Sequence, residues 1–325
     1  MLAVMAVGCL TSCEDILGHW EKPTPAVNPT PTFDALSTPL TFEAVSGTVT
    51  VTINTDMATG KTIEYSTDDG ATWTEGTPSL GGGADIDHCE NPVTITGSKV
   101  LLRGTNAAYS GSGKYTNIVC DADCYIYGNI MSLIDKDNFA TLTELDAMQT
   151  FSYLFMANTH IKNHTEKDLV LPATTLEQAC YNGMFEGCTG LTTAPQLPAT
   201  TLEQACYSEM FMGCTGLTTA PELLATTLAT ACYNAMFMGC TSLTTAPELP
   251  AETLQIACYG SMFKDCSNLN SVTCYATNPD QIMALDNWLD GVAATGTIKT
   301  KATMTSGSWT AGTNYPTGWT HDASL

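Results

Sequence analysis

The most restrictive feature of this 325-residue chain is a unit of 26 residues that recurs four times between Leu171 and Cys274. Each copy carries two cysteines eight residues apart, which form the series Cys180, Cys206, Cys232 and Cys258, and the series Cys188, Cys214, Cys240 and Cys266. A fixed period of this length is typical of solenoid proteins, in which each unit is too small to bury its own apolar face and stacks on its neighbours. The repeat therefore predicts an extended surface rather than an enclosed pocket.

Within one unit, the segment from Leu176 to Cys188 predicts an amphipathic helix. Its apolar side chains fall on one half of a helical wheel. Thr174 and Glu177 have the spacing of a capping box, and Gly187 stands where a left-handed C-cap is expected. Residues 191–195 hold two threonines before a proline, which favours a short strand. Each unit is thus predicted to contain a short strand, a turn and a helix.

The motif F-x-G-C-T-x-L occurs at residues 185–191, 211–217 and 237–243. Together with a Leu-Pro-Ala-Thr-Thr-Leu opening at Leu171, it resembles the BspA-like leucine-rich repeats of bacterial surface proteins. A leading copy matches less closely, because Asn158 replaces a cysteine and about four extra residues follow. The resemblance implies an α+β fold, with a short α/β leucine-rich-repeat solenoid over residues 126–274 that contains this degenerate first repeat and four 26-residue repeats.

The chain has 14 cysteines, and helix geometry argues against disulfides within the repeats. Two cysteines eight residues apart on a helix are separated by about 12 Å, beyond the roughly 7 Å limit between the Cα atoms of a bridge. Neighbouring helices pack about 8 to 10 Å apart, which is again too far. We therefore expect two ladders of buried free thiols and no zinc site. Cys120 and Cys124 are the exception, since their spacing permits a local disulfide, with Cys89 as another candidate partner.

Residues 1–13 are predicted to be a lipoprotein signal. This short apolar run ends in Leu-Thr-Ser-Cys at Cys13 and is followed by Glu14 and Asp15. It resembles bacterial lipoprotein signals, in which the cysteine thiol takes the lipid, and the acidic residues resemble the surface-export signal of some Gram-negative outer-membrane lipoproteins. Cys13 is the expected lipidation site and Cys9 the second choice. The basic segment that normally opens a secretory signal is missing.

The lipid is expected to be the only membrane attachment, because no later stretch reaches the roughly 18 apolar residues that span a bilayer. The expected location is therefore the outer membrane or cell surface. Lys plus Arg number 11 against 33 Asp plus Glu, which gives a net charge of −22. Such a charge repels nucleic acids and anionic membrane surfaces. Neither is an expected partner.

The repeats are flanked by three other segments. Residues 14–39 are rich in proline and threonine and predict an extended tether. In residues 49–53 the apolar period changes to two, which predicts a small antiparallel β-sandwich-like domain over residues 40–125. Residues 275–325 are expected to cap the last repeat, with a helix from Pro279 to Gly291.

Three local patterns could support chemistry, and each has a simpler structural interpretation. Residues 66–73 match the Asp-box pattern of sialidase-like propellers, but the other blades of a propeller are absent and turn chemistry explains the motif. His160 and His164 have the spacing of a helical metal pair but lack the intervening glutamate of a zinc protease. His88 and Cys89 lack an orienting third group. We therefore expect no enzyme activity, no cofactor and no metal site.

Outward-facing positions of the repeats form a candidate binding stripe, with Gln196 in phase with its glutamates. The stripe residues are Thr192, Thr193, Thr218, Thr219, Thr244, Thr245, Glu222 and Glu248. Its carboxylates could bind a cation, although a solvated face is the simpler interpretation.

The sequence thus predicts a non-catalytic, monomeric surface lipoprotein whose repeats bind a host or bacterial protein or glycan. Two alternatives remain open. One is a glycan-handling accessory protein or enzyme that uses the β domain, and the other is a structural surface or pilus component.

Overall fold

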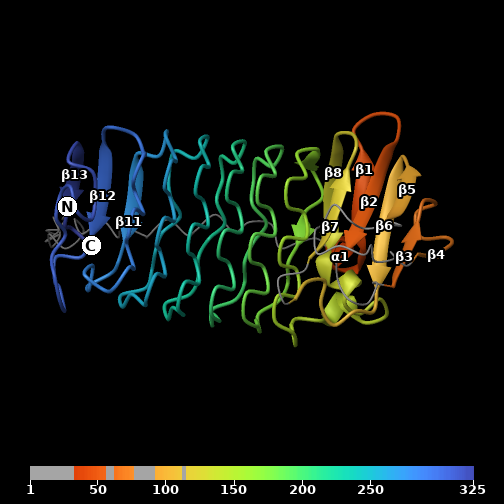
Figure 1. The fold of residues 1–325 in the computed structure, drawn as a ribbon, viewed down its shortest axis with the longest axis horizontal. Helices are drawn as coiled ribbons and strands as arrows, with labels where there is room; N and C mark the ends of the chain where they lie inside the picture. The colour runs from red at the N-terminus through yellow and green to blue at the C-terminus, as the bar shows by residue number, and fades with distance from the viewer. Residues whose placement is uncertain (1–32, 56–61, 77–91, 112–114) are drawn as a thin grey trace, which may run out of the picture.

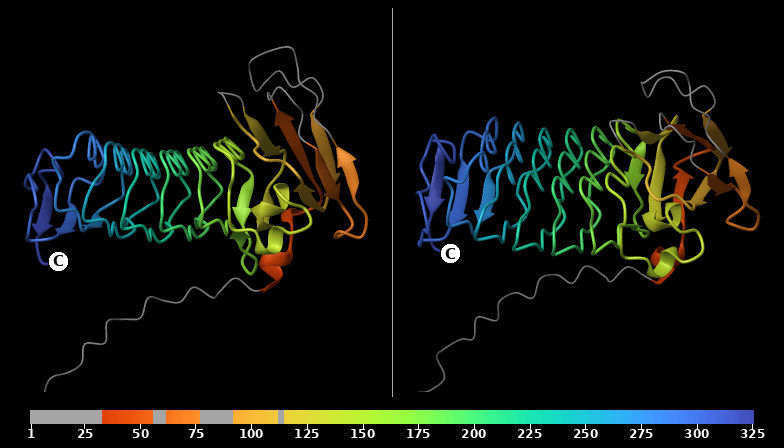
Figure 2. Two further views of the ribbon diagram at one scale, coloured as in Figure 1. Left: turned by 90° about the horizontal axis from the view of Figure 1, so that it is seen from below. Right: turned by 60° about the horizontal axis from the view of Figure 1, so that its bottom comes forward.

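The computed structural model describes residues 33–55, 62–76, 92–111 and 115–325. These residues form an elongated molecule (Figures 1 and 2), in which the first strands gather at one end, a row of stacked coils forms the middle, and the last strands lie at the other end. Helical structure in the described residues is limited to α1 (Phe33–Ser37) and two short 3-10 helices, η2 (Ile130–Leu133) and η3 (Phe139–Thr141).

Strands of the first half of the chain form two sheets, and the last three strands form a third. The bounds are β1 (Leu40–Ala44), β2 (Val49–Thr55), β3 (Ile63–Ser66), β4 (Thr74–Gly76), β5 (Val93–Gly97), β6 (Lys99–Gly104), β7 (Thr116–Cys120), β8 (Cys124–Asn129), β9 (Ile161–Asn163), β10 (Leu169–Val170), β11 (Ser271–Cys274), β12 (Gly296–Thr300) and β13 (Trp319–Asp322). The largest sheet has the order β10-β8-β1-β6-β3-β4, and the second has the order β5-β2-β7. The period of two in β2 buries Val49, Val51 and Ile53.

Backbone hydrogen bonds join the β end directly to the coils. Strands β9 and β10 both pair with β8 in parallel. The N–H of Ile118 donates to the carbonyl of Leu154 (2.7 Å), and the N–H of Cys124 donates to the carbonyl of His160 (3.1 Å). Strands β7 and β8 therefore form the layer on which the first coil stacks. The boundary expected between residues 125 and 126 falls inside β8.

The helices predicted in the repeats are wrong. Residues 177–188 form a row of overlapping turns whose alternate N–H groups point in different directions. The N–H of Cys180 donates to the carbonyl of Glu177 (3.2 Å), whereas the N–H of Tyr181 donates to the carbonyl of Cys206 in the next coil (3.0 Å). This alternation continues to Cys188 and recurs in the following coils. In an α-helix, all of these groups would bond within the helix itself.

The predicted α+β leucine-rich-repeat solenoid is therefore wrong as a fold class. The described chain is nearly all β, with three sheets and one five-residue α-helix. Where short strands were expected after the helices, neighbouring coils are linked by isolated parallel bridges, such as Thr193 with Thr219 and Leu197 with Leu223. Turns, bridges and inter-coil hydrogen bonds replace the alternation of strands and helices.

Left-handed backbone positions explain this outcome. Positive φ angles recur every fourth residue, at Ala179 (53°), Gly183 (57°) and Gly187 (71°). Each of these residues holds the third position of a four-residue turn, where type II turns require a positive φ. A four-residue period places positions i, i+4 and i+8 on one side, as a helix does approximately over this length. The apolar pattern alone therefore could not separate the two structures.

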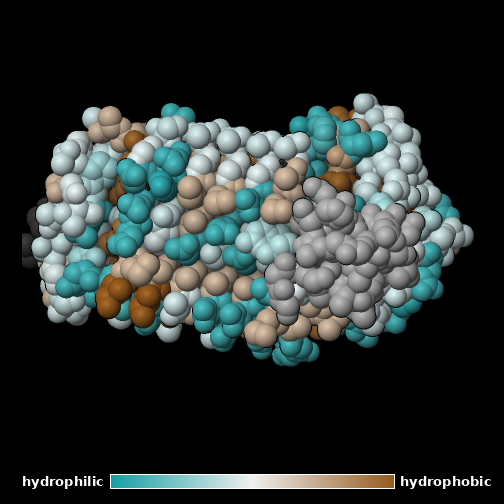
Figure 3. All heavy atoms as spheres, in the orientation of Figure 1, coloured by the Kyte–Doolittle hydropathy of each residue, from teal (hydrophilic) through white to brown (hydrophobic). Residues whose placement is uncertain are grey.

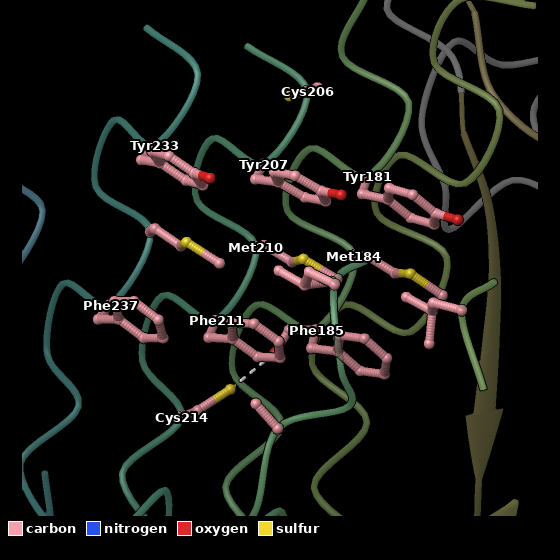
Figure 4. Close-up of a cluster of buried hydrophobic side chains, with 14 of the residues drawn as sticks. Tyr181, Met184, Phe185, Cys206, Tyr207, Met210, Phe211, Cys214, Tyr233 and Phe237 are labelled. Atoms are coloured by element: carbon pink, nitrogen blue, oxygen red, sulfur yellow. Dashed lines mark hydrogen bonds between the residues drawn. The ribbon is translucent and has the colours of Figure 1, made fainter. Parts of the chain in front are cut away.

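Two columns of stacked aromatic rings fill the interior of the coils (Figure 4). One column contains Tyr181, Tyr207, Tyr233 and Tyr259, with ring centroids 5.8 to 6.1 Å apart. The other contains Phe155, Phe185, Phe211, Phe237 and Phe263, with centroids 5.4 to 5.7 Å apart. Met184 and Met210 lie between the columns and are fully buried. Burial of each large side chain contributes about 1.5–3 kcal/mol, so these columns form the core of the stack.

The prediction of buried free thiols is confirmed, because every described cysteine is free and buried. Each thiol of the second series donates to a phenylalanine carbonyl of the preceding coil at 3.0 to 3.1 Å, as Cys214 does to Phe185. Asn158 occupies the same position in the leading coil and donates to the carbonyl of Ile118 (3.0 Å). Cys120 and Cys124 are both free and buried, so no disulfide joins them. Cys89 lies outside the described residues.

The helix predicted from Pro279 to Gly291 is also wrong, because this segment forms a further coil. Its backbone accepts hydrogen bonds from the preceding coil, for example from the N–H of Phe263 to the carbonyl of Trp288 (2.9 Å). The Trp288 ring extends the phenylalanine column at 6.4 Å from Phe263. Strands β11, β12 and β13 then pair in parallel beyond the coils.

Replacing Phe211 by alanine should lower the free energy of unfolding by about 3–5 kcal/mol, because a buried ring is lost and a cavity remains. Phe211 stacks on Phe185 at 5.5 Å and on Phe237 at 5.7 Å. Urea denaturation followed by circular dichroism measures this change. The exposed Thr215 in the same coil is the control, and Thr215→Ala should change the free energy by less than about 0.5 kcal/mol. Equal effects of the two substitutions would contradict this account of the core.

The coil thiols should resist alkylation in the folded protein and react only after unfolding. Burial raises the pKa of Cys180 and of Cys214 to about 12, so the reactive thiolate is scarce. Iodoacetamide labelling at pH 8 followed by peptide mass spectrometry should find these residues unmodified in buffer and modified in urea. Labelling of Cys180 or Cys214 in buffer would show that the stack is open.

Candidate functional site

A four-residue insertion distinguishes the first coil from those that follow. The corresponding left-handed positions Ala157 and Gly187 are 30 residues apart, whereas Gly187 and Gly213 are 26 apart, a difference of four. The extra residues lie in the loop 164–168 between β9 and β10. This loop cannot follow the path of the coils beside it. A concavity lies beside this loop.

The concavity is a groove of about 580 Å³ between β8, the loop 164–168 and the first two coils. Its wall is mainly apolar and its rim is polar. The apolar residues are Leu36, Ile126, Leu169, Val170, Leu171, Pro172, Leu191, Ala194, Pro195 and Pro198, and the polar residues are Asn163, His164, Lys167, Asp168, Thr193 and Gln196. A concave apolar wall with a few polar groups is the usual composition of a binding site.

Lys167 holds the loop against the β sheet. Its ammonium group donates to a Glu43 carboxylate oxygen (3.0 Å) and to the Tyr127 hydroxyl (3.2 Å), and lies 4.4 Å from the centre of the Tyr127 ring. Tyr127 also donates to the same Glu43 oxygen (2.5 Å). The Tyr127 hydrogen bond, followed by the charge and hydrogen bond of Lys167, lowers the pKa of Glu43 despite partial burial. We call these three side chains the latch.

The latch separates the groove from a second cavity of about 500 Å³. Lys167 and Asp168 line both cavities, and Tyr127 lines the second. The loop 164–168 is therefore a partition with a cavity on each side. Besides Lys167, the loop is attached to β8 by a hydrogen bond from the N–H of Gly128 to the carbonyl of Asp168 (3.0 Å) and by the His164 ring against Tyr127.

Asn163 connects the groove to the predicted stripe. Its side-chain oxygen accepts hydrogen bonds from the N–H groups of Thr192 (2.9 Å) and Thr193 (3.0 Å), and its amide donates to the Thr193 carbonyl (2.8 Å). In the next coil, the N–H groups of Thr218 and Thr219 bond instead to the Thr192 carbonyl. The Asn163 side chain thus replaces a backbone carbonyl where the insertion displaces the chain.

All eight residues of the predicted stripe are exposed. Thr193 lines the groove, and so does Gln196, which is in phase with Glu222 and Glu248. The stripe therefore begins at the groove and continues over the later coils. Asn163, Lys167, Glu43 and Tyr127 were not singled out from the sequence. The only sequence signal for them is the longer spacing of the first unit.

The histidines of the predicted metal pair make local contacts instead. His160 contacts Asp123 at 3.2 Å, and the His164 ring nitrogen accepts a hydrogen bond from the N–H of Glu166 (3.0 Å), so the two histidines do not form a metal pair. Among the described residues, no group of three or more potential ligands could hold a metal ion. His88 and Cys89 lie outside the described residues.

The Asp-box-like segment forms a hydrogen-bonded hairpin turn. The carboxylate of Asp68 accepts hydrogen bonds from the Thr72 hydroxyl (2.6 Å) and N–H (2.9 Å) and from the Ser66 hydroxyl (2.7 Å). The bonds from Thr72 contribute most to lowering the pKa of Asp68 to about 2. The Trp73 ring is covered by the Arg103 guanidinium at 3.8 Å. These contacts stabilise a turn and leave Asp68 ionised, which is unsuitable for a general acid.

Exposed large apolar side chains are few in the described part of the chain. They are Val45, Met148, Leu224, Ile256, Ile282 and Met283. On the face shown in Figure 3, hydrophilic and near-neutral side chains cover most of the coils, and strongly hydrophobic atoms form only small groups. None of the described helices is long and apolar enough to cross a membrane. The predicted lipidation residues Cys13 and Cys9 lie outside the described residues.

No family model matches this chain, and no curated protein or solved structure matches it significantly. The resemblance to BspA-like repeats therefore depends on the sequence motif alone. The groove, the latch and the stripe are the structural features on which a function can be based.

Substituting Glu43 by glutamine should lower the free energy of unfolding at neutral pH. It should also make that free energy fall less as the pH is lowered. Since folding lowers the pKa of Glu43, its ionised form stabilises the fold above its ordinary value of 4.5, and this contribution is lost as the pH falls through the folded-state value. The difference in unfolding free energy between wild type and Glu43→Gln should therefore shrink between pH 7 and pH 3. Urea titrations measure it. Glu166→Gln, in the loop that carries Lys167, is the control, and a pH-independent difference for Glu43→Gln would exclude the latch.

Proposed function

We propose that this protein is a non-catalytic binding protein whose stripe and groove together hold a macromolecular ligand, either a protein or a glycan. The observation that carries the proposal is the continuity of the two features: Thr193 belongs to the stripe and also lines the groove. A row of exposed hydroxyl and carboxylate groups with an apolar cavity at one end can contact an extended ligand at several points.

The rigidity of the coils supports this proposal. The stripe is supported by the aromatic columns and by hydrogen bonds between coils, such as that from the Thr218 N–H to the Thr192 carbonyl (2.9 Å). A preorganised surface loses little conformational entropy on binding. Regularly spaced groups on such a surface suit a ligand with its own regular spacing.

The proposed location follows the sequence motif. We propose that the protein is exported and held at the outer membrane or cell surface by lipid on Cys13, with Cys9 as the second choice. The acidic body would then act as a monomer without inserting into the membrane. A net charge of −22 supports solubility and opposes non-specific association with anionic surfaces.

Lysine substitutions in the stripe should weaken ligand capture by about tenfold or more, because they place bulk and the opposite charge on the contact surface. The test uses the full chain, because β7 and β8 form part of the stack and a coil fragment would lose them. Cys9→Ser and Cys13→Ser remove the predicted lipidation sites from the protein used in the test. Glycan arrays and panels of extracellular proteins provide the ligands, and biolayer interferometry measures binding to Thr219→Lys/Thr245→Lys.

The matched control is Gln204→Lys/Thr230→Lys, which adds the same charge at exposed positions of the turn rows. Its binding should stay within about threefold of wild type. If both pairs weaken binding equally, or if neither does, the stripe is not the binding surface.

A further inference from the structure

The charge of the coil stack restricts the class of ligand. From residue 168 to residue 263 the chain contains no lysine, arginine or histidine. It contains eight carboxylates in the same span: Asp168, Glu177, Glu186, Glu203, Glu209, Glu222, Glu248 and Glu252. A surface of this length with one sign of charge attracts cationic partners and repels anionic ones.

Most of this negative charge is not neutralised within the molecule. Glu252 is paired with Lys301 (2.6 Å), and Glu209 accepts a hydrogen bond from the Tyr153 hydroxyl (3.1 Å). Burial, followed by the charge of Glu209 in the next coil, raises the pKa of Glu186. Neither Glu222 nor Glu248 has an ion pair among the described residues.

The two lysines of the first coil are already engaged, and a ring nitrogen of His164 accepts a hydrogen bond from the N–H of Glu166. Lys167 is bound to Glu43 in the latch, and Lys162 contacts Asp123 at 3.3 Å. A cationic ligand that approaches the groove therefore meets no free lysine of the described chain. Beyond the groove, it meets the carboxylates of Glu222 and Glu248 in successive coils.

The dimensions of the stripe suit an extended polypeptide. Successive coils are separated by about the distance between stacked phenylalanine rings, 5.5 to 5.7 Å in the middle of the stack. Alternate residues of an extended peptide are about 6.6 Å apart and point to the same side. Alternate basic side chains can therefore reach the carboxylates of successive coils while an apolar side chain enters the groove.

We propose that the ligand is a basic polypeptide that anchors an apolar side chain in the groove and lays lysine or arginine side chains along the stripe. This inference rests on the proposed function and narrows its ligand class. The apolar wall accounts for the anchor, since burying a leucine side chain strengthens binding about 10- to 100-fold. An exposed ion pair changes affinity by less than about fivefold, so the ion pairs select charge and the groove supplies most of the affinity.

The probe is a fluorescein-labelled peptide of alternating lysine and serine with one central leucine, and fluorescence anisotropy measures its binding to the full chain. We expect binding that weakens with added salt. A peptide with glutamate in place of lysine should not bind, and one with serine in place of leucine should bind about 10- to 100-fold more weakly.

Two pairs of variants locate the peptide. Thr193→Trp fills the groove and should weaken binding about 10- to 100-fold. Thr230→Trp places the same ring at an exposed position of the turn rows that belongs to neither the groove nor the stripe, and should change binding by less than about threefold. Glu222→Gln/Glu248→Gln should weaken binding about three- to tenfold, and Glu177→Gln/Glu203→Gln should have a smaller effect. Thermal unfolding of each variant verifies that it is folded.

Equal binding of the lysine and glutamate peptides, or equal effects of Thr193→Trp and Thr230→Trp, would overturn the inference. A neutral glycan that binds where the basic peptide does not would overturn it too. In that case, sensitivity of glycan binding to Thr219→Lys/Thr245→Lys would leave the proposed function intact. If no ligand responds to that pair of substitutions, the proposed function fails with it.

Discussion

The alternating direction of backbone N–H groups in the turn rows is the constraint on which the rest of the structure depends. One N–H closes a turn in its own coil and the next bonds to the following coil, as in Cys180 and Tyr181. A typical hydrogen bond contributes about 1 kcal/mol, similar to the roughly 1–2 kcal/mol cost of a left-handed non-glycine residue such as Ala179. The backbone pattern alone therefore has little net stability. Burial of the Tyr, Met and Phe side chains that it aligns must provide the rest.

The candidate site arises where this regularity is interrupted. The four additional residues of the first coil have no counterpart in the coils that follow, so they break the regular ladder on that side. Side chains compensate: Asn163 replaces a carbonyl, and Lys167 fixes the loop to Glu43 and Tyr127. The groove remains because this arrangement leaves an apolar wall uncovered. Regular coils thus supply the long surface, and the irregular coil supplies its cavity.

Part of this architecture could be predicted from the sequence. The repeat period and the burial of Tyr181, Phe185 and Cys188 follow from one-sided apolar spacing, which any turn of about four residues reproduces. The conformation could not be predicted, because Ala179 and Ala205 take left-handed angles that alanine does not signal. The same one-sided spacing predicts that the stripe threonines are exposed, because they fall on the opposite side from the buried rings. The latch was not, since Lys167 and Glu43 are 124 positions apart.

The equivalence of the middle coils has a consequence for how such a chain can change in length. The inter-coil backbone hydrogen bonds of each middle coil join it only to the coil before it and the coil after it, and they are those of its neighbour displaced by 26 positions. If one whole unit were gained or lost, β7 and β8 would still stack on the first coil. Strands β11, β12 and β13 would still follow a coil of the same kind. The number of units is therefore a variable independent of both ends. It sets how many coils the stripe covers, while the groove beside β8 keeps its shape.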